Sequence, residues 1–247
     1  SELQGPRFEV VLGDEVDRAD AAEGYVARGK AVSPYDGLVI DADYIKEAAR
    51  TGGMRQVLYA VATRSPSGER SFREPTEADL AAVQAAERRF AEARDRWLTE
   101  GVLPTESFPD GNDVRPRTFG LDHWLDFFSP RQALVHGVFA EEYARLVPEV
   151  RKAMGARADD LLTELAMMQS KALNYNSRLA SWNVGQQTIR SVFDRHDFAF
   201  KWSFAEFEGA EALFGWGFER LVANYEELST LLDETGAEDL GGPDRVS

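Results

Sequence analysis

The stretch KALNYNSRLASWN, residues 171–183, is where a helical pattern gives way to amides, and the fold depends on what those amides do. Asn174, Asn176 and Asn183 stand there among aromatic and basic side chains. Helix interiors seldom hold three asparagines so close together, because the short amide competes with the backbone for hydrogen bonds. The stretch therefore predicts either a polar turn that organises the fold or a surface that reads a ligand.

Helical patterns surround this stretch. Residues 158–173 predict a helix rich in leucine and methionine, and residues 215–236 predict a last amphipathic helix. Upstream, Ser129 can cap a helix that starts at Pro130, with Gln132 placed to reach back to the amide of the cap. We expect that helix to run to about residue 147, with Pro148 opening a continuation or a kink.

The preceding part of the chain combines one long helix with short strands. Residues 76–101 predict an amphipathic helix that starts at Thr76 with Asp79 and closes at Gly101. Residues 102–120, which carry proline and glycine, predict an irregular linker. Strands are expected at 7–13, 24–32, 38–40 and 54–64, turns at 33–37 and 65–70, and a short helix at 41–53.

These elements predict an α+β protein, with a small β-rich unit packed against a larger, mainly helical domain. The expected divisions are a β-rich unit over 1–70, the long helix and linker over 71–120, a helical domain over 121–236 and a disordered tail over 237–247.

Composition excludes several kinds of chemistry. The chain of 247 residues has no cysteine, so disulfides, thiolate nucleophiles and cysteine-based zinc sites are excluded. Its three histidines are far apart in sequence, and we expect no metal site. No apolar run is long enough to span a membrane and no leader is apparent, so a cytoplasmic location is expected.

Charge is unevenly distributed. The net charge of −15 would on average repel nucleic acid. Residues 171–202 reverse this trend, with five basic side chains against Asp194 and Asp197, a net of +3. Aromatic residues alternate with these basic ones, an arrangement that suits stacking on bases beside phosphates. The same alternation over residues 198–207 suits a strand with core aromatics equally well, and both interpretations stay open.

Catalytic motifs are absent from the sequence. Neither a phosphate-binding GxxxxGK[ST] loop nor a GxGxxG turn nor a GxSxG elbow is found. His196 lies between aspartates and could be a tuned base, but a hydrogen-bonded histidine in a turn is the favoured interpretation. The acidic pairs Asp159-Asp160 and Glu226-Glu227 are interpreted as solvated helix faces, and an independent enzyme is disfavoured.

Four blocks in order resemble adenine-specific DNA methylases that carry a zinc-ribbon insertion, a family often found with genome-defence genes. NYNSRLASWN (174–183) and IRSVFDRHDFAFKWSFAEF (189–207) are similar to its signature block, which closes on W-x-F-A-E. DFFSPRQAL (126–134) and residues 43–63 are similar to upstream blocks, so the resemblance covers most of residues 24–218.

Two departures bear on function. Where the family ribbon ends in C-P-x-C-G, this chain has Ser33-Pro34-Tyr35-Asp36-Gly37, so the ribbon is degenerate and zinc is not expected. The family's S-adenosylmethionine-binding glycine motif and its catalytic D-P-P-Y motif are also absent. The resemblance therefore implies the middle region of a methylase, with S-adenosylmethionine bound elsewhere in the parent enzyme.

We expect an accessory or target-recognition region of an adenine-N6 DNA methyltransferase, of a restriction-modification or phage-defence kind, not catalytic by itself. It would bind DNA weakly or together with a catalytic methylase domain. The residues expected to contact DNA are Asn174, Asn176, Arg178, Trp182, Arg190, Arg195 and Lys201. The alternative is a non-catalytic interaction module that docks onto a methylase core or a defence partner.

Overall fold

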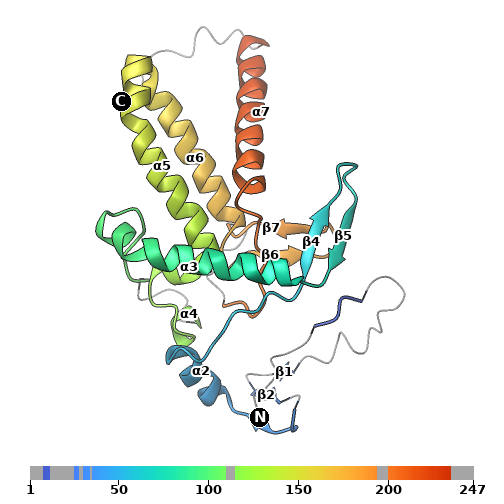
Figure 1. Ribbon diagram of the computed structural model, residues 1–247. Helices are drawn as coiled ribbons and strands as arrows, with labels where there is room; N and C mark the ends of the chain where they lie inside the picture. The colour runs from blue at the N-terminus through green and yellow to red at the C-terminus, as the bar shows by residue number, and fades with distance from the viewer. Residues whose placement is uncertain are drawn as a thin grey trace.

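The computed structural model describes residues 8–11, 25–27, 30–33, 35–109, 115–193 and 200–234 (Figure 1). These residues form helices and small antiparallel sheets, which confirms an α+β fold. The helices are α2 (Ala42–Arg50), α3 (Glu77–Thr99), α4 (Arg115–Thr118), η2 (Trp124–Phe127), α5 (Pro130–Met154), η3 (Gly155–Arg157), α6 (Ala158–Tyr175) and α7 (Ala212–Glu234). The strands are β1 (Val26–Ala27), β2 (Lys30–Val32), β3 (Val39–Ile40), β4 (Val61–Arg64), β5 (Arg70–Arg73), β6 (Ser181–Asn183) and β7 (Thr188–Arg190).

Capping boxes start α3 and α5 where the sequence places them. In α3, Thr76 Oγ1 accepts from Asp79 N–H and the Asp79 carboxylate accepts from Thr76 N–H. In α5, Ser129 and Gln132 exchange the same pair of bonds while buried from solvent. Each box satisfies donors that a helix start leaves without partners.

Helix α5 runs well past the end predicted for it. Pro148 lies inside the helix, which continues to Met154. Val147 and Val150, on either side of that proline, pack in a cluster with Ala158 and Leu162 of α6. We attribute the continuation to this packing, which outweighs the local cost of a missing N–H.

Helices α5, α6 and α7 form a layer with α6 in the middle, and α3 crosses its lower end (Figure 1). The crossing is close because Gly137 of α5 has no side chain: a Cβ there would lie 2.5 Å from the Trp97 ring of α3. Trp97 is accordingly 2% exposed. The absence of one side chain thus lets two long helices touch.

The segment predicted as an irregular linker contributes to the core. Phe108 and Leu121 pack with Phe127 and Leu179, all of them buried. The ring of Phe108 lies 5.1 Å from that of Trp124 and 5.3 Å from that of Phe127. Leu179 belongs to the amide-rich stretch, so this cluster joins that stretch to the core.

The N-terminal sheet has the order β1-β2-β3, with β2 paired antiparallel to both neighbours. Gly37 has a φ of +71°, as predicted for the turn before β3. Two strand predictions need correction. Residues 8–11 of the strand predicted at 7–13 are not in a sheet, and only Val61–Arg64 of the predicted 54–64 is a strand. Pro34 and residues 237–247 lie outside the described residues.

Candidate functional site

Asn174, in the last turn of α6, binds the chain that leaves β7. Its Oδ1 accepts hydrogen bonds from Ser191 Oγ at 2.7 Å, Val192 N at 2.8 Å and Phe193 N at 2.9 Å. Asn174 is 8% exposed. One carboxamide oxygen therefore accepts from two backbone N–H groups of a segment that has left its sheet. Backbone N–H groups away from water need such acceptors.

Asn176 is the C-cap of α6 and connects two further segments. Its side-chain oxygen accepts from Phe207 N at 3.1 Å, and its main-chain carbonyl contacts His136 Nε2 of α5 at 3.2 Å. Asn176 is 1% exposed. The end of α6, the second turn of α5 and the segment before α7 are thus held by one residue.

Arg178 continues the turn toward the core. Its N–H donates to Phe127 O at 2.8 Å, and its Nη1 donates to Asp126 O at 2.9 Å. Burial lowers the pKa of the Arg178 guanidinium, and the Asp126 carboxylate acts in the opposite direction. The guanidinium therefore uses one of its N–H donors on the turn that leads to Ser129.

Glu206 joins the start of α5 to the segment before α7. Arg131 binds it through two parallel bonds, Nε–Oε1 at 2.8 Å and Nη2–Oε2 at 3.0 Å, while Ser129 Oγ donates to Oε2 at 3.0 Å. Both charged side chains are mostly buried, 16% and 24% exposed. A paired, bidentate geometry of this kind holds its two partners in one orientation.

We call Asn174, Asn176, Arg178, Arg131 and Glu206, with the groups that they bind, the asparagine junction. Of the two roles that the sequence left open for these amides, Asn174 and Asn176 have the first: they form a polar turn that organises the fold. Their predicted contacts with nucleotides stay a prediction. Ser129, Asn176 and Glu206 lie in three separate stretches, 126–134, 174–183 and 189–207, and the junction brings those stretches together.

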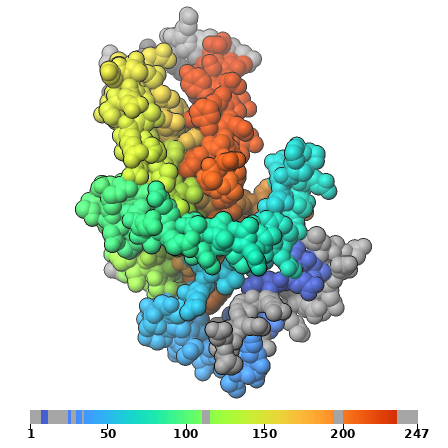
Figure 2. All heavy atoms as spheres, in the orientation of Figure 1, coloured from blue at the N-terminus to red at the C-terminus, as the bar shows by residue number. Residues whose placement is uncertain are grey.

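The junction supports the β6–β7 hairpin, which packs against the β4–β5 hairpin. Phe72 of β5 meets Trp182 of β6 edge to face, with ring centroids 5.7 Å apart. Arg70 Nη1 donates to Gln186 O in the turn between β6 and β7 at 2.8 Å. Figure 2 shows β4–β5 projecting from the body of the molecule beside α7. We call β4–β5 and β6–β7 the paired hairpins.

Charge on the paired hairpins is opposite in sign to that of the whole chain. Residues 61–73 and 181–190 contain four arginines and one acid, Glu69, a net of +3. Arg73 is ion-paired with Asp79 of α3 and holds the pKa of that carboxyl well below its usual range. The arginines left for a ligand are Arg64, Arg70 and Arg190.

Arg64 and Arg70 stand directly opposite each other in the β4–β5 register. Ser65 N–H donates to Glu69 O, and hydrogen-bonded pairs alternate with non-hydrogen-bonded pairs along an antiparallel ladder. Arg64 and Arg70 are therefore a non-hydrogen-bonded pair, the kind in which side chains approach most closely. Like charges at such positions are unfavourable. An anion on this face would relieve the repulsion.

The other predicted DNA contacts are dispersed. Trp182 is half-buried against Phe72, and Arg190 is exposed at the end of β7, where it forms no ion pair with a described residue. Lys201 is half-buried beyond the junction, and Arg195 and His196 lie outside the described residues. Of the interleaved aromatics, Phe200 stacks on Phe119, whereas residues 200–207 form no strand.

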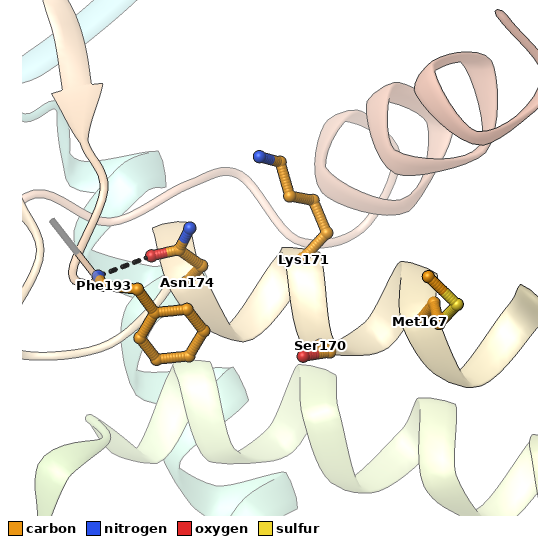
Figure 3. A pocket seen from close by; sticks show the side chains of 5 residues that line it. All are labelled: Met167, Ser170, Lys171, Asn174 and Phe193. Atoms are coloured by element: carbon orange, nitrogen blue, oxygen red, sulfur yellow. Dashed lines mark hydrogen bonds between the residues drawn. The ribbon is translucent and has the colours of Figure 1, made fainter. Parts of the chain in front are cut away.

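A shallow depression lies at the end of α6, lined by Met167, Ser170, Lys171, Asn174 and Phe193 (Figure 3). Its volume is about 220 Å³, below the roughly 300–1,000 Å³ of small-molecule sites. Lys171 lies over the Tyr175 ring, 5.1 Å from its centroid. The size of the depression does not favour a cofactor site.

The described residues show neither a metal-binding cluster nor a helix that could span a membrane. Within them, no group of three or more histidine, aspartate or glutamate side chains is placed to hold a metal ion. None of the described helices combines the length and apolarity needed to cross a bilayer. Comparison with protein-family models, with curated proteins and with solved structures finds no match to this chain.

Sequence reasoning missed the pair Arg64–Arg70 because it did not predict β5. The signal was present in ATRSPSGERSFR (62–73), in which residues of alternating character flank a Ser-Pro-Ser-Gly turn. Reading that stretch as a hairpin would have set the two arginines opposite each other.

Proposed function

We propose that this chain is an accessory or target-recognition region of an adenine-N6 DNA methyltransferase, and that it carries no catalytic step of its own. The observation that supports this most is the asparagine junction. Stretches 126–134, 174–183 and 202–207, which separately resemble the methylase family, share one network of mostly buried hydrogen bonds. A set of residues that interact in this way has a reason to occur together in a sequence.

The paired hairpins are the DNA-contacting surface of this proposal. Arg64, Arg70 and Arg190 would neutralise phosphates, since guanidinium groups bind phosphate oxygens in a bidentate manner. Asn183, Gln186 and the half-buried Trp182 lie on the same hairpins and would contact sugars or bases. The junction would hold this surface at a fixed orientation to the helices.

The proposed partner supplies the chemistry. S-adenosylmethionine and the catalytic D-P-P-Y motif would belong to a methylase domain, because this chain has neither that motif nor the glycine motif for the cofactor. No residue of this chain is assigned to methyl transfer. Its contribution would be to position the duplex or the flipped adenine.

Fluorescence anisotropy of a labelled duplex tests the proposal when it is repeated from low to physiological salt. Each phosphate contact contributes about 0.9 to the slope of log affinity against log salt. Arg64→Ala/Arg190→Ala should therefore lower the slope by about 2. Arg145→Ala/Arg151→Ala removes the same charge from α5, away from the hairpins, and should leave the slope unchanged.

Two results would count against DNA binding by the paired hairpins. One is an absence of binding at low salt, which would leave the charge of −15 as the dominant property of the chain. The other is an equal effect of both double variants, because that would show a response to total charge alone.

A further inference from the structure

Helix α7 exposes a long apolar stripe. Its large apolar residues with the greatest exposure are 38–61% accessible: Phe218, Val222, Tyr225, Leu228, Leu231 and Leu232. The stripe from Phe218 to Leu232 is about 21 Å long at 1.5 Å per residue. Surface helices normally turn such residues toward a core, and extended apolar patches mark interaction sites.

The first turns of α7 are packed and set its position. Leu213 is fully buried, and Phe214 stacks on Phe139 of α5 with centroids 4.5 Å apart. Gly217 lies against Met168 of α6. The Glu208 carboxylate accepts from the N–H groups of residues 210–212 and caps the helix start. The exposed stripe is therefore on a helix that is fixed at one end.

Farther along, α7 separates from α6. Figure 1 shows the two helices close together at the start of α7 and apart toward its end. Leu228 and Leu231 of α7 are more than half exposed, and Leu161 near the start of α6 is 37% exposed. The diverging helices leave an apolar surface, which we call the α7 face.

The spacing of the α7 face is that of a helix-docking seam. Phe218, Val222, Tyr225 and Leu232, with Ser229 between the last two, follow one another at intervals of four and three residues, the a/d spacing of a heptad pattern. Each of these residues would be a knob for a second helix laid alongside. A flat or irregular partner would not need this period.

The acidic residues of α7 indicate the charge that a partner helix would carry. Glu219, Glu226 and Asp233 are seven residues apart, and each directly follows a seam residue, so they occupy the e positions, an acidic row that flanks the seam. None of them forms an ion pair with a described residue, and the α7 sequence has five acids against Arg220. A partner helix with a lysine or arginine row would match this edge, whereas a second copy of α7 would bring like charge.

We propose that the α7 face docks an amphipathic helix of another polypeptide, with leucine-like side chains in heptad spacing and a flanking row of lysine or arginine. The proposal does not depend on DNA binding, because it uses none of the paired hairpins. It gives the chain two separate surfaces, one basic and one apolar with an acidic edge.

Two labelled synthetic helices test this with the full chain. Both have leucine at heptad positions a and d; one has lysine and the other glutamate at e and g. In fluorescence anisotropy, the chain should bind the lysine peptide at least about tenfold more tightly than the glutamate peptide.

Reversal of two acidic charges on α7 tests whether the acidic row faces the bound peptide. Glu219→Lys/Glu226→Lys should invert this preference, so that the glutamate peptide binds more tightly. Glu142→Lys/Glu149→Lys reverses two acids with the same spacing on α5 and should preserve the wild-type preference. Circular dichroism would check that each variant retains its helices. The duplex-binding slope should be the same for wild type and for Phe218→Ser/Tyr225→Ser, which alters the α7 face without a change of charge, and this separates the test from the DNA proposal.

Three outcomes would overturn the proposal. Equal affinity for the two peptides would exclude a charge-matched helix, and so would a charge exchange that fails to invert the preference. The third is a dimer of the chain in sedimentation that dissociates in Phe218→Ser/Tyr225→Ser. That result would make a second copy the occupant of the α7 face.

Discussion

His136 makes the stability of the fold depend on pH. The residue is 6% exposed on α5, between the rings of Phe128 and Phe214, and its Nε2 faces the main-chain carbonyl of Asn176. A carbonyl only accepts, so Nε2 carries a proton, and the pKa that burial lowers to about 4 leaves the ring neutral at pH 7. Within the described part of the chain Nδ1 has no partner. Protonation there would place a charge in the core.

The magnitude follows from the shift in pKa. Burial lowers the pKa of His136 from 6.5 to about 4, with the hydrogen bond to Asn176 acting in the opposite direction. Below pH 6.5 His136 binds a proton in the unfolded chain but stays neutral in the folded chain. The free energy of unfolding therefore falls as pH decreases toward 4. For these two values the loss between pH 7 and pH 5 is about 2 kcal/mol.

Urea unfolding at pH 7 and pH 5 measures this loss in the wild type and in His136→Gln. Glutamine can still donate to the Asn176 carbonyl but does not titrate. Its fit between the aromatic rings is poorer, so the variant is expected to be less stable at pH 7. The comparison therefore concerns the pH dependence: the wild type should lose about 2 kcal/mol more than the variant.

A matched variant and one clear outcome complete the test. His123→Gln alters an exposed histidine and should retain most of the wild-type loss. If His136→Gln lost as much stability as the wild type between the two pH values, the buried neutral imidazole would not be the source, and the reasoning would be wrong.

Two other substitutions test the packing and the junction by urea unfolding at pH 7. Gly137→Ala should destabilise by about 1–3 kcal/mol, because its Cβ would meet the Trp97 ring, whereas Gly215→Ala, with open space around it, should stabilise α7 by up to about 1 kcal/mol. A similar effect of both would disprove the close crossing. Asn174→Ala removes the acceptor of three hydrogen bonds and should cost about 2–3 kcal/mol, against little change for the exposed Asn224→Ala.

Local rules explain why much of the helical fold could be predicted. A capping box depends only on residues three apart, so Thr76 with Asp79 and Ser129 with Gln132 could be found without knowing the fold. Helix periodicity likewise marked α6 and α7. The glycine turn before β3 depends on Asp36-Gly37 alone.

Elements whose formation depends on distant contacts were missed or mistaken. At Pro148 local signals leave a continuation or a kink open, and α5 continues to Met154 because its neighbours pack on α6. Phe108 was assigned to a linker because its segment is rich in proline and glycine, and only the folded chain shows its ring against Phe127.

The sequence by itself determined the charge of the chain, the absence of cysteine, the capped starts of α3 and α5 and the position of the amides. Only the tertiary structure decided what the amides do. Asn174 binds residues 191–193, and Asn176 binds residue 207 and His136. Burial of an amide depends on which segments fold over it, and segments far apart in the chain can meet only when the core that joins them has formed.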